Sequence, residues 1–469
     1  MPPSRPLPSP PRLPPRPTRS IPAVQKDPVH LPLYRRLLYP RAPLYLSVPP
    51  FLDGDTLEIV LLNERIHHLI ALALRYYVLS WYSRLSPRDR TLLPIINSQI
   101  IRPILQPILT SIQSNPSNIT ILLLLDLPNI ISIHLRTFRQ SLEARNVLSP
   151  LPGIKTLGEA YHSRLPLLSV CLIPSNTPSP PTTSNQNNFS PIYLTALADS
   201  LTKLYIPIET QSEVESPILR EILGRAVLGA ISRRLVEGWF WYQIILRFLG
   251  EPKSNVTVKE TAVKERTTAT EDIWAFFVRL WTVLLGIWTW ATGVVALYSE
   301  TSRDERYDGC HLIWLGVIRE ILGVDEERIW HRRLIWGSLE MFVNLLGPII
   351  DRLSPHIVNE YLLTSQNALR TCDLLEKILF PLDGYPAPAP PDPTPDEAED
   401  LRLLAEQRIA QVIPPMLRKV FYPSLAHITR LLAPISDTSC NAHLVGMTLD
   451  AVVGALVPEL VIQNNSKKA

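Results

Sequence analysis

The sequence has little glycine and cysteine, and it lacks the short motifs of the familiar enzyme classes. Among 469 residues there are 17 glycines and 4 cysteines, whereas proline reaches 47. No glycine-rich phosphate loop, no His-Glu-x-x-His zinc motif and no Gly-x-Ser-x-Gly nucleophile elbow occurs. We therefore expect no catalytic residues, no metal site and no cofactor, and we predict a protein that is not an enzyme.

The four cysteines, Cys171, Cys310, Cys372 and Cys440, are isolated from one another, and no hydrophobic secretory signal opens the chain. The spacing therefore indicates neither a disulfide framework nor a cysteine-based metal site. We expect the protein to face the reducing cytosol rather than a secretory lumen.

The basic charge is concentrated at the N-terminus. The whole chain has a formal net charge of +3, yet residues 1–50 carry 8 Lys or Arg against 1 acidic residue. This segment is rich in proline and has almost no periodic apolar pattern, so we predict that it is disordered or extended. Pro11, Pro14 and Arg16 fit a PxxPxR ligand for an SH3-type partner, and the alternative is a solvated tail without a partner.

Apolar residues recur at helical spacing through much of the chain, and 46% of all residues are hydrophobic. Helices are predicted over residues 57–85, 92–112 and 119–142, with internal prolines expected to break or kink them. The clearest helix is predicted over residues 217–236, with Ser216 as its N-cap. Its expected apolar face consists of Ile218, Leu219, Ile222, Leu223, Ala226, Val227, Ala230 and Ile231. The sequence therefore predicts an all-α fold.

Changes in composition divide the chain into several segments. The predicted organisation is a tail over residues 1–50, a helical domain over 55–250, a charged linker over 251–271, an apolar connecting helix over 272–310, and a second helical domain over 311–463 that contains a proline-rich acidic loop over 383–400. A length of 469 residues accommodates two such domains with their own cores.

Two helical segments are almost free of charge. Residues 280–298 are uncharged and close to the ~20 residues that span a bilayer, so they form a transmembrane helix, a buried helix or a membrane-embedded hairpin. Residues 441–460 contain only Asp450 and Glu459 as charged side chains, which predicts a helix that is buried or contacts lipid.

Several polar side chains have a functional and a structural interpretation. The adjacent pairs His67-His68 and Cys310-His311 make poor metal sites because their side chains diverge on a helix, so ordinary surface or helix-end positions are favoured. His443 lies close in sequence to Cys440 and Asp437, a set that can converge at one helix start. The favoured role of Asp437 is that of a helix N-cap.

Tryptophans and arginine pairs allow similar alternatives. Core packing or anchoring at a bilayer interface explains Trp239, Trp241, Trp274, Trp281, Trp288 and Trp290. Because these aromatics alternate with Leu and Val rather than with Lys and Arg, we expect no nucleic-acid partner. The pairs Arg233-Arg234 and Arg332-Arg333 either meet lipid phosphate or lie on solvated helix faces.

An ordered series of motifs in the last third of the chain resembles the sorting-nexin C-terminal (nexin C) domain. The resemblance is carried by residues 333–352 (RLIWGSLEMFVNLLGPIIDR) and 435–450 (ISDTSCNAHLVGMTLD), with further motifs over 379–381, 413–421 and 456–460. It covers residues 311–463 in the order of that family.

The preceding part of the chain resembles the PX-associated (PXA) domain over residues 55–250. The resemblance is carried by residues 81–87 (WYSRLSP), by 126–139 with His134, and by 216–223 (SPILREIL). Where the family commonly has a His-Pro-Ala-Leu-like element, this chain has YHSRLP at 161–166. Recognisable PX and RGS domains are absent from the sequence, so the chain resembles a reduced sorting nexin.

These resemblances imply a lipid-binding or tethering protein of endomembranes, with an apolar groove for acyl chains between two packed halves. The expected partners are membrane lipids or fatty acids. Candidate lipid-binding residues on the two nearly uncharged segments are Trp281, Leu284, Leu285, Trp288, Leu444, Met447, Val452 and Leu456. Both halves are expected on the cytosolic face of the endoplasmic reticulum or endosome. The alternative is a helical scaffold that binds proteins in endosomal trafficking without lipid.

Overall fold

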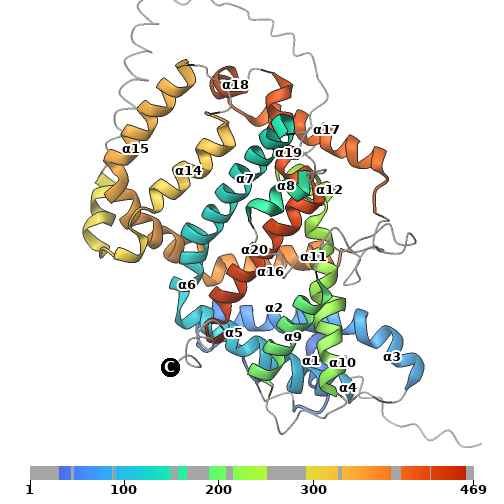
Figure 1. The fold of residues 1–469 in the computed structure, drawn as a ribbon. Helices are drawn as coiled ribbons and strands as arrows, with labels where there is room; N and C mark the ends of the chain where they lie inside the picture. Colours follow the sequence, from blue (N-terminus) through green and yellow to red (C-terminus); the bar gives the residue numbers. More distant parts are fainter. Residues whose placement is uncertain are drawn as a thin grey trace, which may run out of the picture.

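The computed structural model describes residues 31–43, 47–86, 89, 91–148, 157–165, 190–206, 215–250, 292–325, 330–381, 392–422 and 424–460. Within these ranges every regular element is a helix and none is a strand, so the predicted all-α fold is confirmed. Helices from the two ends of the chain pack directly against one another, as Figure 1 shows for α2 with α16 and for α7 with α14.

The helices up to residue 250 are α1 (Leu33–Leu38), α2 (Leu57–Leu74), η1 (Arg75–Leu79), α3 (Ser80–Leu85), α4 (Leu92–Ile96), η2 (Asn97–Ile101), α5 (Arg102–Ser114), α6 (Pro116–Ile121), η3 (Leu122–Asp126), α7 (Leu127–Leu148), α8 (Leu157–Arg164), α9 (Pro191–Tyr205), α10 (Glu215–Glu221), η6 (Ile222–Leu228), α11 (Gly229–Val236) and α12 (Gly238–Leu249). Residues 292–300 are also helical.

The later helices are η7 (Glu305–Tyr307), α14 (Cys310–Leu322), α15 (Trp330–Ile357), η8 (Val358–Leu362), α16 (Ser365–Leu379), α17 (Pro395–Val412), α18 (Pro415–Phe421), α19 (Leu425–Ser436) and α20 (Thr438–Leu456). The symbol η marks a π-helical turn, except for η7, which is a 3-10 turn.

Internal prolines do not end the predicted helices, and π-helical turns accompany two of these prolines. The turn η2 immediately precedes α5, in which Pro103 occupies the first turn, and η3 precedes Pro128 in the same way. A π-turn changes the hydrogen-bonding register of the backbone and so accommodates the missing proline N–H. Residues 92–114 and 116–148 therefore continue as long helices where the sequence suggested breaks.

The prediction that all of residues 1–50 are disordered is wrong for its last part. Residues 33–38 form α1, which packs against α2. Tyr34 and Leu38, four residues apart, are buried in a cluster with Ala71 and Leu74 of α2 and Leu93 of α4. Four-residue spacing places the two side chains on one helix face, which is enough to fix this short helix on a larger one. Pro11, Pro14 and Arg16 lie outside the described residues.

The acidic end of the predicted loop 383–400 is also helical. The helix α17 begins at Pro395, where Thr394 accepts a hydrogen bond from the N–H of Glu397 and the Glu397 carboxylate accepts one from the N–H of Thr394. This reciprocal capping box stabilises the first turn of α17, and the acidic side chains of that turn interact favourably with the positive end of the helix dipole. Together they explain why the helix begins within the predicted loop.

The helix predicted over 217–236 forms as three consecutive elements, but its apolar face points outward. Ile218, Ile222 and Ile231 are about half exposed, whereas Gly224 and Gly229 are buried. A Cβ atom at Gly224 would lie 3.0 Å from the backbone of Thr195 in α9. The close helix contact therefore uses the glycine side, and the isoleucines stay about half exposed.

The last helix, α20, lies in the centre of the molecule between helices of the first half (Figure 1). It packs against α7, α8 and α11, and its Ala442 and Val445 share a buried cluster with Leu194 of α9 and Val236 of α11. Asn441 donates hydrogen bonds to the backbone carbonyls of Val236 and Ile435. The prediction that this nearly uncharged segment is buried or contacts lipid is consistent with its central position.

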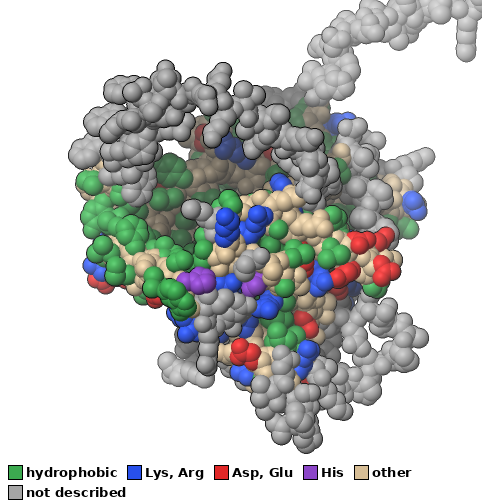
Figure 2. All heavy atoms as spheres, turned by 90° about the horizontal axis from the view of Figure 1, so that it is seen from above, with side chains coloured by type: hydrophobic (Ala, Val, Ile, Leu, Met, Phe, Trp, Pro, Cys, Tyr) green, Lys and Arg blue, Asp and Glu red, His purple; other side chains and the backbone are tan. Residues whose placement is uncertain are grey.

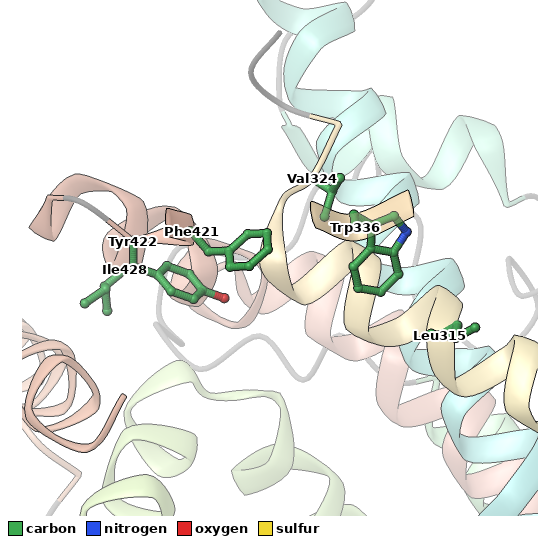
Figure 3. Close-up of a cluster of buried hydrophobic side chains, with 6 residues drawn as sticks. All are labelled: Leu315, Val324, Trp336, Phe421, Tyr422 and Ile428. Atoms are coloured by element: carbon green, nitrogen blue, oxygen red, sulfur yellow. The ribbon is translucent and has the colours of Figure 1, made fainter. Parts of the chain in front are cut away.

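At the opposite side of the molecule, α14 packs against both α7 and α15. One end of α15 is fixed by the cluster of Figure 3. In this cluster Trp336 of α15 lies with Leu315 of α14, with Val324 in the turn after α14, and with Phe421, Tyr422 and Ile428 of the α18–α19 region. The Tyr422 hydroxyl donates a 2.9 Å hydrogen bond to the carbonyl of Ile321.

Three stretches of described helix are long and apolar enough to cross a membrane by length and composition alone: Leu92–Ser114, Pro116–Arg145 and Trp330–Leu362. They differ from the segment 280–298 suggested by the sequence, most of which lies outside the described residues.

Candidate apolar binding sites

The helix α15 exposes an unusual number of large apolar side chains. It packs chiefly against α14, and only one side of it is covered. Leu334, Met341 and Leu345 form one exposed stripe, and their exposed fractions are 59%, 73% and 76%. The next stripe around the helix is formed by Leu339 and Phe342, which are also exposed. Scattered apolar residues are ordinary on a protein surface, but a contiguous set of this kind marks a binding surface.

The neighbouring helices continue this apolar character. Trp314 and Ile318 of α14 are exposed at a spacing of four residues, and Ile131 of α7 is exposed as well. Because α7 belongs to the first half and α14 to the second, the surface extends across their junction. Figure 2 shows the molecule hollowed when seen from above, with hydrophobic side chains gathered along the side where α15 lies. We call the exposed apolar residues of α14 and α15 the α14–α15 surface.

A second apolar site is a cavity of about 230 Å³ between the α4–η2 helix and the α10–η6 helix. Its lining comprises Leu92, Ile95, Ile96, Gln99, Ile100, Thr202, Ile206, Ser216, Ile218, Leu219 and Ile222. Ile218 and Ile222 belong to the outward-facing side of the α10–α11 helix described above. A cavity with so few polar groups suits an alkyl chain better than a polar ligand.

The candidate lipid-binding residues on α20 are half buried. Leu444, Met447, Val452 and Leu456 face neighbouring helices incompletely, and none belongs to the exposed apolar residues. Trp281, Leu284, Leu285 and Trp288 lie outside the described residues. Sequence reasoning therefore missed the α14–α15 surface. The available signal was the segment around Met341 and Phe342, in which large apolar residues occupy every side of the helix except that of Glu340 and Asn344.

The polar cluster at the seam between the two halves is buried. His134 of α7 pairs through Nδ1 with the hydroxyl of Tyr161 in α8 at 2.8 Å, and its Nε2 lies 3.3 Å from the carbonyl oxygen of Pro434. Nδ1 of His162 lies 3.2 Å from Nδ1 of His443 in α20, so one ring donates and the other accepts. Burial lowers the pKa of His134 and His443 to about 4, and it lowers the pKa of His162.

The structure explains the atypical element YHSRLP. Its tyrosine, Tyr161, is fully buried and bonded to His134, and its histidine, His162, meets His443. Asp437 accepts a 3.0 Å hydrogen bond from the N–H of Cys440, which confirms its predicted role as the N-cap of α20. These residues therefore lock α7, α8 and α20 together.

The surface position favoured for His67 is wrong, because His67 is buried among Tyr34, Tyr39 and Phe51. Its Nε2 lies 3.2 Å from the carbonyl oxygen of Pro49, and burial lowers its pKa to about 4. The residue belongs to the core that holds α1 on α2.

The pair Cys310-His311 occupies a helix start, as predicted. The Asp351 carboxylate from α15 accepts hydrogen bonds from the N–H groups of Gly309 and His311 and pairs with Nδ1 of His311 at 2.8 Å. Burial raises the pKa of Asp351, but the hydrogen bonds from His311 and Gly309 outweigh this and the net shift is downward. The carboxylate thereby caps α14 and fixes it to α15.

Both alternatives for Arg332, a contact with lipid phosphate and a solvated helix face, are wrong. Its guanidinium is buried and Nε donates a 2.7 Å hydrogen bond to the carbonyl of Val420. Arg333 is exposed. Trp239 and Trp241 of α12 are half buried, and the Trp241 indole donates to the carbonyl of Leu235, so both contribute to packing. The other tryptophans of the 274–290 segment lie outside the described residues.

The chemistry available at these sites is apolar binding. In the part of the chain that the structure describes, no group of three or more His, Cys, Asp or Glu side chains is arranged to hold a metal ion. The buried histidines are enclosed by protein and held neutral, which suits a structural role. The two apolar sites, by contrast, are open to ligands.

Comparison with known families agrees with part of this picture. Residues 61–248 match the PXA domain, close to the limits predicted from the resemblance. The PXA domain is a non-catalytic domain of the sorting-nexin type, and its presence suggests a sorting-nexin-like trafficking protein. Neither a curated protein nor a solved structure matches the chain. The resemblance of residues 311–463 to nexin C stays a prediction.

Proposed function

We propose that the protein binds acyl lipids of endomembranes and takes part in membrane tethering or trafficking without being an enzyme. Acyl chains lie on the α14–α15 surface, along the junction of the PXA-matching half with the nexin-C-like half. The protein acts on the cytosolic face of the endoplasmic reticulum or endosome. The PXA match supports the trafficking class, and the apolar sites support the ligand class.

The single observation that carries this proposal is the exposure of α15. A helix that presents Leu334, Leu339, Met341, Phe342 and Leu345 to water loses the hydrophobic stabilisation of those side chains, about 1.5–3 kcal/mol for each one that a ligand would bury completely. An acyl chain recovers this stabilisation without requiring directional bonds. It also fits the hollow beside α15 seen in Figure 2.

The alternative function is that of a helical scaffold whose apolar surface receives a protein partner. The same exposed residues fit an amphipathic helix of another protein. The exposed apolar residues of α14 and α15 and the apolar cavity at α4–α10 favour lipid, because an acyl chain needs only apolar contacts.

We expect the purified full chain to carry phospholipid or fatty acid at a roughly stoichiometric level. Native mass spectrometry and lipid extraction after gentle purification measure this occupancy. The double substitution Leu339→Glu/Phe342→Glu should lower bound lipid by about ten-fold or more, because an unpaired charge against an acyl chain costs several kcal/mol.

The matched control is Phe248→Glu on α12, which is 80% exposed and remote in sequence from the α14–α15 surface. It should leave lipid occupancy unchanged. Lipid-free protein that stays folded and monodisperse would contradict the proposal. Equal lipid occupancy in the wild type and the double variant would place the ligand elsewhere.

A further inference from the structure

The helical extension formed by η1 and α3 has no buried residue. It continues α2 beyond the point where α2 is held by α1 and α16. Val78 and Leu79 of η1 pack against the buried cluster around Leu38 and Leu74, while α3 packs chiefly against η1 itself. Figure 1 shows α3 projecting from the rest of the molecule. Tertiary packing supplies most of the stability of protein helices, and in this extension it comes chiefly through η1.

One side of this extension is a stripe of large apolar and aromatic residues. Tyr77, Trp81 and Leu85 follow one another at intervals of four, and their exposed fractions are 64%, 50% and 75%. The Trp81 indole N–H donates a 2.9 Å hydrogen bond to the carbonyl of Tyr77. The polar atom of the tryptophan is therefore satisfied within the helix, and its ring can leave water without losing a hydrogen bond.

The stripe itself lies in a stretch of sequence without acidic residues. The sequence has no acidic residue between Glu64 and Asp89, and Arg84 is exposed beside Leu85. Two more arginines, Arg88 and Arg90, follow in the sequence. Asp89 is engaged locally, because it accepts hydrogen bonds from the Tyr82 hydroxyl at 2.5 Å and from the N–H and hydroxyl of Thr91.

We propose that the η1–α3 extension docks the protein on the surface of an anionic lipid bilayer. Tyr77, Trp81 and Leu85 enter the boundary between headgroups and acyl chains, where aromatic side chains concentrate in membrane proteins. Arg84 meets lipid phosphate. A protein partner would be expected to bring its own apolar face, whereas Arg84 beside the stripe matches the negative potential of a membrane.

This docking surface is independent of the α14–α15 surface. The latter holds individual acyl chains, whereas the extension contacts the bilayer from which such chains come. The two are separate in sequence and are tested by different variants. If the purified protein carries no lipid, the docking proposal is unaffected. If the protein does not bind vesicles, the proposal that it binds acyl lipids is unaffected.

The test uses the full chain with vesicles of phosphatidylcholine alone or with about 30% phosphatidylserine, at low and at physiological salt. Vesicle flotation measures binding, and hydrogen–deuterium exchange of peptides over residues 75–86 locates it. We expect binding to require phosphatidylserine, and exchange of this peptide to slow several-fold when vesicles are present. The variant Trp81→Glu/Leu85→Glu should reduce binding by about ten-fold or more.

Phe248→Glu serves again as the control, because it adds charge at an exposed apolar position without touching the extension. The proposal is overturned if the wild type fails to bind the vesicles, or if it binds while exchange over residues 75–86 stays unchanged. It is also overturned if this peptide becomes protected with rising protein concentration alone, because the stripe would then join two copies of the chain.

Discussion

Residues 1–250 and 300–469, expressed separately, are expected to aggregate or to require detergent, and to become soluble when they are co-expressed. The reason is the position of α20, which belongs to the second half but lies against α7, α8 and α11 of the first. Removing either partner exposes the buried side chains of Ala442, Val445, Leu194 and Val236 to water. Expression of the fragments alone and together, followed by size-exclusion chromatography, measures the effect. Two soluble fragments that do not associate would contradict it.

A point substitution tests the same seam within the intact chain. A Cβ atom at Gly238 would lie 2.8 Å from the carbonyl oxygen of Ile435 and 3.3 Å from Cα of Ser436. Because these are backbone atoms, Gly238→Val should lower the free energy of unfolding by about 3 kcal/mol. Gly293→Val is the control, since a Cβ atom there meets nothing within 4 Å. Urea unfolding compares the two variants. Equal free energies of unfolding for Gly238→Val and Gly293→Val would show that the backbone at Gly238 can move away from Ile435 and Ser436 without loss of stability.

Much of the fold was predictable because apolar periodicity reports helices directly. The segment 57–85 is helical throughout, and residues 92–112 and 119–142 lie within long helices. The prolines do not break these helices: a π-turn precedes Pro103 and Pro128, and Pro107 lies inside α5. The short helix α1 was missed because Tyr34 and Leu38 gain their stabilisation only from contact with α2, which no local pattern reveals.

The orientation of helices was less predictable than their existence. In the α10–α11 helix the apolar face was expected inside, but the glycines Gly224 and Gly229 allow α9 to approach the opposite side. In α15 the polar residues Arg333, Glu340, Asn344 and Asp351 share one side and the other sides are apolar, so periodicity does not indicate which apolar side is covered. The candidate binding sites arise from these two cases. Predicting either site required the tertiary arrangement. An apolar pattern indicates that a helix face avoids water, but it does not indicate which element covers that face.

Mild acid is expected to destabilise the protein through its buried histidines. Burial lowers the pKa of His67, His134 and His443 to about 4, from the ordinary value of 6.5, and also lowers that of His162. The unfolded chain therefore binds protons at a higher pH than the folded protein does. Stability is fully present above about pH 6.5 and is lost as the pH falls towards 4.

The expected size of this effect is large. Each histidine with a folded-state pKa of about 4 should remove about 2 kcal/mol between pH 7 and pH 5. Three such residues together approach the whole stability of a typical domain, about 5–15 kcal/mol. At the seam, protonation would also place like charges on His162 and His443, whose Nδ1 atoms are 3.2 Å apart. His134, Tyr161, Cys440 and Asp437 are titratable groups beside them. Asp437 raises the pKa of His134 and His162, but burial has the larger effect and the net shift is downward.

Urea unfolding from pH 7.5 to pH 5 measures this loss. The variant His443→Leu removes one neutral buried histidine whose Nε2 has no hydrogen-bond partner in the described structure. It should therefore show a shallower decline of the unfolding free energy with falling pH, whatever its stability at pH 7.5. The control His68→Gln replaces a partly exposed ring that lies 3.4 Å from Glu376, and it should keep the steep decline of the wild type. A free energy of unfolding that is constant down to pH 5 would show that the buried histidines do not resist protonation. If the unfolding free energy of His443→Leu falls with pH as steeply as that of the wild type, His443 does not contribute to the loss.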